Sequence, residues 1–170
     1  GVGACVHSAI YTGNVEDKYP AIGTKVDVNG KAVHVIEAGD TSAPPVLMIH
    51  GASANAREFT FTLAPRLDDR FHVLMADRPG HGYSERPEAS ETLAVQAAQM
   101  AGALKALAPG RKAVVVGHSY GGAVALRLDE NGPARTETPE RVVEPAGDGD
   151  QLGRDGGIQI RTAKLRGALE

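Results

Sequence analysis

Short, continuously apolar runs constrain the fold of this chain more than any other feature of its sequence. They cover residues 46–49, 71–76 and 113–116. A strand with one face in water alternates apolar and polar residues, whereas an unbroken apolar strand is typical of a parallel sheet covered on both faces. The runs therefore predict buried parallel strands at the centre of a sheet.

Segments compatible with helices separate and follow these runs, at residues 55–67, 90–107 and 120–130. Ser90 is the expected N-cap of the second segment. Alternation of strands and helices gives βαβ units with right-handed crossovers, and therefore an α/β fold. The second segment has apolar residues at spacings of three and four, as on one helical face: Leu93, Ala97, Met100, Leu104 and Leu107.

An antiparallel hairpin is predicted ahead of the parallel strands. Residues 24–28 and 31–37 alternate apolar and polar side chains. Asn29 and Gly30 separate them, and this pair favours a two-residue hairpin turn because both residues tolerate positive φ. The expected fold class is thus α/β, with a partly parallel sheet opened by an N-terminal hairpin.

The two ends of the chain differ from this α/β segment. Residues 1–23 contain Gly, Asn, Pro and scattered charge without periodicity, and are predicted to be an irregular lead-in. Residues 131–170 are rich in Gly and charge, with strand seeds only at 142–143 and 158–160, so we expect a poorly ordered or atypical tail. Residues 24–130 are left as the α/β domain.

Composition excludes some classes of partner. The formal net charge is −3 and neither sign clusters along the chain, so nothing recruits nucleic acid or an anionic membrane surface. The one cysteine, Cys5, cannot form an intramolecular disulfide, which is compatible with a reducing compartment and favours the cytoplasm. Residues 2–5 also resemble the lipobox of a bacterial lipoprotein, so anchoring to the cell envelope through Cys5 is the alternative.

A Gly-x-Ser-x-Gly pattern stands where the third apolar run meets the following helical segment, at residues 117–121. This context predicts a nucleophile elbow, in which Ser119 has a strained backbone and projects its hydroxyl from the carboxyl edge of the sheet. Gly117 and Gly121 lack Cβ atoms and so allow strand and helix to pass closely. The alternative is a glycine-rich turn that carries a serine by chance.

Two backbone N–H groups are candidates for binding a developing oxyanion. The pair His50-Gly51 follows the first apolar run, and the N–H of Ala52 in this loop is the first candidate. The N–H of Tyr120, one residue past Ser119, is the second, because the start of a helix favours negative charge. A His-Gly pair after a strand is also common as a simple turn.

A third loop completes a resemblance to the α/β-hydrolase superfamily. Residues 77–84 read Asp-Arg-Pro-Gly-His-Gly-Tyr-Ser and close the second apolar run. With the His-Gly loop and the elbow, they resemble the motifs of that superfamily in order and spacing over residues 24–130. The resemblance implies a structural role for Asp77, whose carboxylate would accept backbone N–H bonds at a tight turn. A catalytic role for Asp77 is the alternative.

The resemblance implies a serine hydrolase. Related dehalogenases and epoxide hydrolases place aspartate where this chain has Ser119, so the serine indicates acyl transfer from a small ester or similar acyl substrate. This chemistry requires no metal and no organic cofactor. A nucleotide-binding α/β module is a weaker alternative, because no glycine-rich loop matches a Walker or dinucleotide fingerprint.

The histidines depart from the superfamily pattern, in which the triad acid and then the histidine follow the nucleophile. His50 is the nearest substitute base, although its expected role is to order its own loop, and the side chain of His118 is expected to diverge from Ser119. All the histidines precede Ser119: His7, His34, His50, His72, His81 and His118.

A second interpretation follows from this departure. The chain is then a catalytically inactive, truncated or frame-shifted fragment that lacks the triad histidine and acid. Without the later strands of the sheet, residues 113–116 would form an apolar edge with unpaired backbone groups. Self-association through that edge is the expected result.

Overall fold

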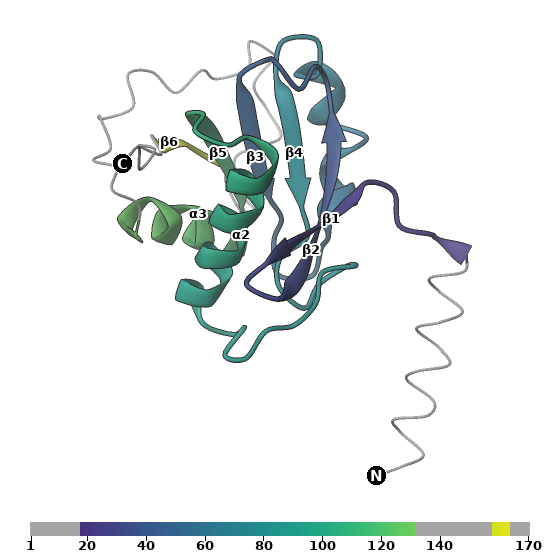
Figure 1. Ribbon diagram of the computed structural model, residues 1–170. Helices are drawn as coiled ribbons and strands as arrows, with labels where there is room; N and C mark the ends of the chain where they lie inside the picture. Colours follow the sequence, from purple (N-terminus) through teal and green to yellow (C-terminus); the bar gives the residue numbers. More distant parts are fainter. Residues whose placement is uncertain (1–17, 132–157, 164–170) are drawn as a thin grey trace, which may run out of the picture.

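The computed structural model of the protein describes residues 18–131 and 158–163. A single β-sheet is at the centre of this part of the chain. Its strands lie in the order β1-β2-β4-β3-β5-β6 (Figure 1). Pairing is antiparallel from β1 through β2 to β4 and parallel among β4, β3 and β5, which confirms the predicted fold class. The strands are β1 (Thr24–Val28), β2 (Lys31–Ala38), β3 (Pro45–Ile49), β4 (His72–Ala76), β5 (Ala113–His118) and β6 (Ile158–Ala163).

The turn between β1 and β2 has the predicted conformation. Asn29 and Gly30 have φ values of 55° and 75°. The N–H of Gly30 also donates to Asp27 Oδ1 at 3.1 Å. Two consecutive residues with positive φ match the twist of the flanking strands, so the Asn-Gly pair sets the register of the hairpin.

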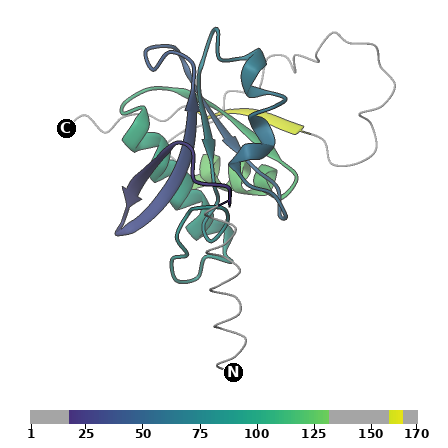
Figure 2. The same cartoon turned by 90° about the vertical axis from the view of Figure 1, so that its right-hand side faces the viewer.

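The central strands are buried on both faces, as their unbroken apolar sequences predict. Successive side chains of a strand point to opposite faces, so Leu47 and Ile49 pack on one side while Val46 and Met48 pack on the other. Helices α2 (Leu93–Leu107) and α3 (Tyr120–Asn131) cover the first side, and the short 3-10 helices η1 (Ala56–Phe59) and η2 (Ala64–Arg66) cover the second. Figure 2 shows α2 and the η helices on opposite sides of the sheet.

The continuous helix predicted over residues 55–67 is wrong. Two separate 3-10 helices, η1 and η2, occupy this segment. Pro65 stands in the first turn of η2 and cannot donate the backbone N–H that a continuous helix needs. The hydroxyls of Thr60 and Thr62 donate to carbonyls of the preceding turn, and such bonds compete with helical pairing.

The N-cap predicted for the second helix is also wrong by two residues. Thr92 caps α2, and its side-chain oxygen accepts from the N–H of Val95 at 3.3 Å. Ser90 is buried instead, and its carbonyl accepts from the side chain of Gln96 at 2.8 Å. Ala89 has a φ of 52°, so the chain turns just before the helix and moves its start beyond Ser90.

The predicted open edge at β5 is wrong for the described residues, because β6 pairs with β5 in the antiparallel direction. The register places Val114 opposite Thr162 and Val116 opposite Ile160. The strand seed at residues 158–160 is thus confirmed, and the sheet ends on β6. The seed at residues 142–143 and the cysteine at position 5 lie outside the described residues, and the division of the chain at residues 23 and 131 stays a prediction.

Candidate active site

Ser119 occupies the sharp turn between β5 and α3, and its backbone is strained. Its φ is 52°, in the left-handed region that costs a residue with a Cβ atom about 1–2 kcal/mol. The N–H of Gly122 donates to the Ser119 carbonyl at 2.9 Å and holds the turn closed. The residue is exposed. The expected backbone strain is confirmed, and the side chain is accessible to a ligand.

The glycines on either side of Ser119 are required by close packing. A Cβ atom on Gly121 would overlap the carbonyl oxygen of Ile49 and lie 2.7 Å from that of His50. A Cβ atom on Gly117 would overlap the carbonyl of Gly121. The obstacles are backbone atoms, which cannot rotate away. The end of β5 therefore passes close to the start of α3, as the pattern of glycines predicted, and α3 also begins directly against the end of β3.

The loop after β3 lies against the elbow. A Cβ atom placed on Gly51 would be 3.3 Å from the Cβ of Ser119 and 3.4 Å from His118 Nδ1. Ala52, the next residue, is exposed. Tyr120 begins α3, where the first backbone N–H groups have no acceptor within the helix. The fold thus places the loop that contains Ala52 against Ser119, while Tyr120 is the next residue along the chain.

Asp77 is a buried hub of hydrogen bonds. Its carboxylate accepts from the N–H of Ala56 at 2.7 Å, from the N–H of Tyr83 at 3.0 Å and from His34 Nδ1 at 2.8 Å. Burial alone would raise the pKa of Asp77, but these hydrogen bonds together lower it below its usual value. The predicted bonding to backbone N–H groups is confirmed, and it ties the loops after β3 and β4 together.

His34 lies behind this carboxylate, between two acceptors. Its Nδ1 faces Asp77 Oδ2 at 2.8 Å, and its Nε2 faces the carbonyl oxygen of Ile22 at 2.7 Å. A carboxylate and a carbonyl oxygen both accept hydrogen bonds, so each ring nitrogen faces an acceptor. Since the ring is only 2% exposed, His34 and Asp77 form a buried hydrogen-bonded pair with a structural role, as expected for His34.

Both ring nitrogens of His50 are hydrogen-bonded, one within its own loop and the other to the loop after β4. Its Nδ1 donates to the carbonyl of Gly51 at 2.8 Å, and its Nε2 accepts from the N–H of Arg78 at 2.9 Å. Burial lowers the pKa of His50 to about 4, so the ring is neutral near pH 7. The predicted ordering role is confirmed, and neither ring nitrogen is left to accept a proton from Ser119.

Arg78 is the residue at this site that the sequence analysis missed. Its side chain is 1% exposed and lies between the loop after β3 and the elbow. The guanidinium donates to the carbonyls of His50 and Gly51 and stacks on the ring of Tyr120. The available signal was an arginine at the end of an apolar strand, where a charged side chain needs a special reason to be buried.

A second missed feature is the pair formed by Glu58 of η1 and His118 of β5. His118 Nδ1 approaches a Glu58 carboxylate oxygen at ion-pair distance beside the loop after β3. The geometry of this contact does not meet the criteria of a hydrogen bond, so we describe it as a close contact between the ring and the carboxylate. The ring of His118 thus faces η1, which lies far from it in the sequence.

The remaining described histidines also contact protein groups. His72 Nε2 lies 2.8 Å from Glu37 Oε2 at the opposite end of the sheet, and His81 Nδ1 lies 3.1 Å from the carbonyl of Pro79. Within the described ranges, no cluster of His, Cys, Asp or Glu is arranged to hold a metal ion. No helix in those ranges combines the length and the apolar character needed to cross a membrane.

Comparison with known sequences gives relatives that include two hydrolases. Epoxide hydrolase A of Mycobacterium tuberculosis is 38% identical over 101 residues, which are 58% of this chain and 31% of that protein. The 2-(acetamidomethylene)succinate hydrolase of Mesorhizobium japonicum is 38% identical over 100 residues, 59% of this chain and 34% of that protein. The chain thus spans about a third of the length of these curated relatives.

Solved structures agree with the sequence relatives. Epoxide hydrolase A from Mycobacterium thermoresistibile superposes with a TM-score of 0.56 at 29% identity, covering 62% of this chain and 34% of that one. An esterase from Exiguobacterium antarcticum gives a TM-score of 0.57 at 26% identity, covering 65% and 40%. A family model described as the alpha/beta hydrolase family matches residues 46–168, more than half of the sequence. The chain therefore belongs to the alpha/beta hydrolase family.

Proposed function

We propose that this chain provides the nucleophile and the oxyanion hole of a serine hydrolase that acts on a small ester or similar acyl substrate. The observation that carries the proposal is the positive φ of Ser119, an exposed residue held against Gly51. A strained serine at a strand-to-helix turn, beside the backbone N–H groups of a helix start and a neighbouring loop, is the arrangement that nucleophilic acyl transfer needs.

The proposed reaction has two steps. Ser119 Oγ attacks the carbonyl carbon of the substrate and loses its proton to a base, while the N–H groups of Ala52 and Tyr120 bind the oxygen that becomes negative. The leaving group departs with a proton, and the acyl group stays on Ser119 as an ester. Water then attacks this ester, which releases the carboxylic acid and restores the hydroxyl.

The nucleophile decides between the activities named among the relatives. These include epoxide hydrolases, an esterase and a succinate-derivative hydrolase. In the superfamily, epoxide opening uses an aspartate at the elbow, and this chain has Ser119 there. We therefore assign the chain to acyl chemistry rather than to epoxide opening.

A catalytically inactive chain is the second candidate. No histidine follows His118 in the sequence, although the superfamily pattern places the base after the nucleophile. His34, His50, His72 and His81 are held by other groups in the described ranges, and the ring of His118 faces Glu58. Without a base, Ser119 would stay a weakly nucleophilic alcohol.

Labelling with a fluorophosphonate distinguishes the two candidates. The reagent phosphonylates an activated serine and places its P=O oxygen in the oxyanion hole. We expect modification of the full chain at Ser119, located by peptide mapping, and none in the variant Ser119→Ala. Modification that is equally fast after Ser119→Ala, or absent from the wild-type chain, would overturn the proposed function.

A further inference from the structure

The guanidinium of Arg78 is a buried cation without an acidic hydrogen-bond partner among the described residues. Nε donates to the His50 carbonyl at 3.0 Å, Nη1 to Gln96 Oε1 at 2.8 Å and Nη2 to the Gly51 carbonyl at 2.8 Å, and Nη2 also lies 3.2 Å from His81 Nε2. None of these partners is a carboxylate, and the side chain is 1% exposed. Burying an unpaired charge is costly, so its place in the fold calls for a function.

The bond to Gly51 matters because of what lies at the other end of the same peptide. The Gly51 carbonyl and the Ala52 N–H belong to one planar trans unit, so they point in opposite directions. Arg78 Nη2 and His50 Nδ1 both donate to this carbonyl, each at 2.8 Å. Fixing the oxygen toward the buried guanidinium therefore fixes the N–H toward the opposite, exposed side.

The same bond changes the strength of the donor. A hydrogen bond from a cation is stronger than one between neutral groups, and it polarises the peptide that accepts it. Polarisation draws electron density toward the Gly51 oxygen and leaves the N–H of Ala52 a better donor. The effect is largest where water is excluded, and Gly51 is buried.

Arg78 also reaches the residue that carries the second donor. Its guanidinium carbon lies 4.8 Å from the centre of the Tyr120 ring, within the range of a cation–π contact. Tyr120 follows Ser119 directly and begins α3. One buried cation thus contacts both segments that would bind the oxyanion.

We propose that Arg78 is a positioning residue of the oxyanion hole, which orients and polarises the Gly51-Ala52 peptide and places positive charge beneath the developing oxyanion. This inference rests on the proposed function of Ser119. Arg78 touches no substrate atom in this role. Its removal is expected to slow the reaction of Ser119 rather than to weaken the binding of a neutral ligand.

The first test compares second-order rate constants for fluorophosphonate labelling of Ser119 in the full chain. Loss of a whole oxyanion donor typically slows catalysis about 10²- to 10³-fold, so weakening one donor through Arg78→Ala should slow labelling about 10- to 100-fold. Guanidinium ions at a concentration far below denaturing should restore part of the rate, whereas urea, a neutral molecule of similar shape, should not. Equal rates for wild type and Arg78→Ala would overturn the inference.

A second pair of variants changes the charge and leaves Arg78 in place. Gln96→Glu puts a carboxylate where Nη1 now has a neutral acceptor at 2.8 Å, and so offsets the cation. Gln96→Met is the matched control, since both variants lose the bond from Gln96 to the Ser90 carbonyl. We expect labelling of Gln96→Glu to be about tenfold slower than that of Gln96→Met. A purely structural role for Arg78 predicts no such difference.

A stability control separates the electrostatic role from general loosening of the fold. Leu104→Ala removes buried volume from α2, away from the loops that Arg78 contacts. At a temperature where melting curves show each variant folded, its labelling rate should match that of the wild type. A wild-type chain unlabelled at Ser119 would overturn the proposed function and this inference together. A labelled wild type with unchanged Arg78 and Gln96 variants would overturn this inference alone.

Discussion

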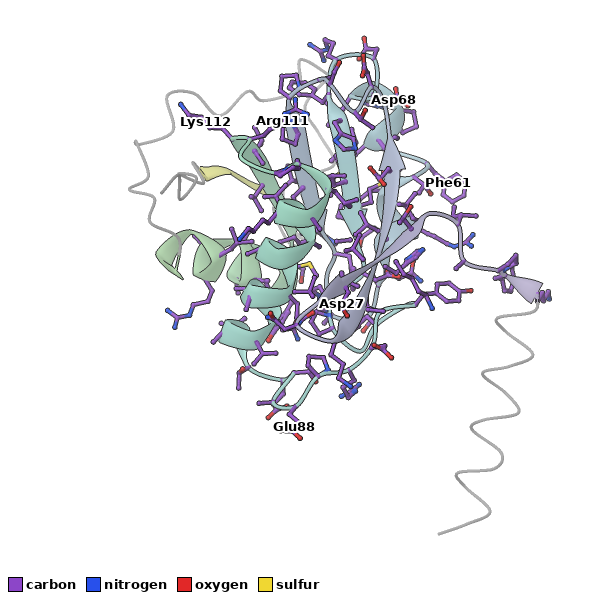
Figure 3. All side chains as sticks on the ribbon, viewed as in Figure 1. Asp27, Phe61, Asp68, Glu88, Arg111 and Lys112 are labelled. Atoms are coloured by element: carbon purple, nitrogen blue, oxygen red, sulfur yellow. The ribbon has the colours of Figure 1, made fainter. Side chains whose placement is uncertain are left out.

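The two ends of the parallel strands are held together by different kinds of interaction. At the carboxyl end, the loops after β3 and β4 are joined by the buried side chains of His50, Asp77 and Arg78. At the amino end, the half-buried Arg111 donates to the carbonyls of residues 41–43 at the surface. Figure 3 shows Arg111 and Lys112 at that end and Glu88 near the other.

This contrast shows that the buried polar side chains that join loops are located at the carboxyl end of the strands. A surface arginine that binds exposed carbonyls competes with water, so each bond contributes little to stability. A buried carboxylate or guanidinium cannot exchange its partners for water, so the loops that it joins keep one geometry. The rigid end is the end that carries Ser119, as expected if the N–H groups of Ala52 and Tyr120 must be aligned before a substrate arrives.

The largest effect should come from removing the hub at the carboxyl end. Asp77→Ala leaves two backbone N–H groups and the buried ring of His34 without their acceptor, so we expect a loss of about 3–5 kcal/mol in the free energy of unfolding. Arg111→Ala, at the amino end, should cost about 1 kcal/mol. Urea titrations measure both values. Similar losses for the two variants would break the comparison between the ends.

Low pH should destabilise the protein through titrating groups at the same end of the sheet. Burial lowers the pKa of His50 from 6.5 to about 4. Between these values the unfolded chain binds a proton that the folded protein does not, so stability falls as the pH falls, by a total on the order of 3 kcal/mol. The lowered pKa of Asp77 acts in the same direction, with its stabilisation lost as the pH falls through the folded value.

Urea titrations at neutral pH and near pH 4 measure this dependence. The variant His50→Gln removes the titrating ring and retains Asp77. Its stability should therefore decrease less steeply over the same pH interval. Identical slopes for the variant and the wild type would show that His50 is not the group responsible.

Replacing a glycine by alanine at each end of the sheet compares the loss of stability that the same chemical change causes there. Gly121→Ala forces a Cβ atom onto the carbonyl oxygens of Ile49 and His50, and should cost about 3 kcal/mol. Gly110, before β5, has a φ of 68° and open space around its Cβ position. Gly110→Ala should therefore cost only the backbone strain, about 1–2 kcal/mol. Thermal melting ranks the pair, and a larger loss at Gly110 would contradict the packing argument.

The smallest effect concerns the edge of the sheet, which belongs to neither end. Prolines at both Gln159 and Ile160 remove backbone donors from β6, and in an antiparallel strand one of the two faces β5. We expect β5 to become available and the chain to shift toward dimers or larger species in sedimentation velocity experiments. An unchanged sedimentation profile would mean that β6 does not protect this edge.

The central strands and the elbow could be predicted because their signals are local. Each signal is contained in the segment whose structure it predicts. Examples are the apolar runs that end at Ile49 and Ala76 and the glycines around Ser119. Pro65 is also a local signal, and it disfavours the continuous helix predicted over residues 55–67. At the start of α2, Ser90 and Thr92 are both good caps, so the sequence alone does not choose between them.

The polar contacts at the site could not be predicted in the same way. Arg78 donates to the carbonyl of His50, which is 28 residues away in the sequence, and His118 contacts Glu58, which is farther away still. Such partners are brought together only by the order of strands in the sheet. The sequence predicted which residues would react, and the structure was needed to identify the buried residues that contact their loops.

The left-handed backbone at Ser119 also determines which replacements this turn accepts. Among residues with a side chain, asparagine and aspartate enter this region most readily, whereas β-branched residues are strongly disfavoured. Ser119→Asp is therefore compatible with the existing backbone, while Ser119→Thr is not, although threonine keeps the hydroxyl. A single exchange at this position can turn an alcohol into a carboxylate without rebuilding the sheet, so related proteins with different reactions can share one architecture.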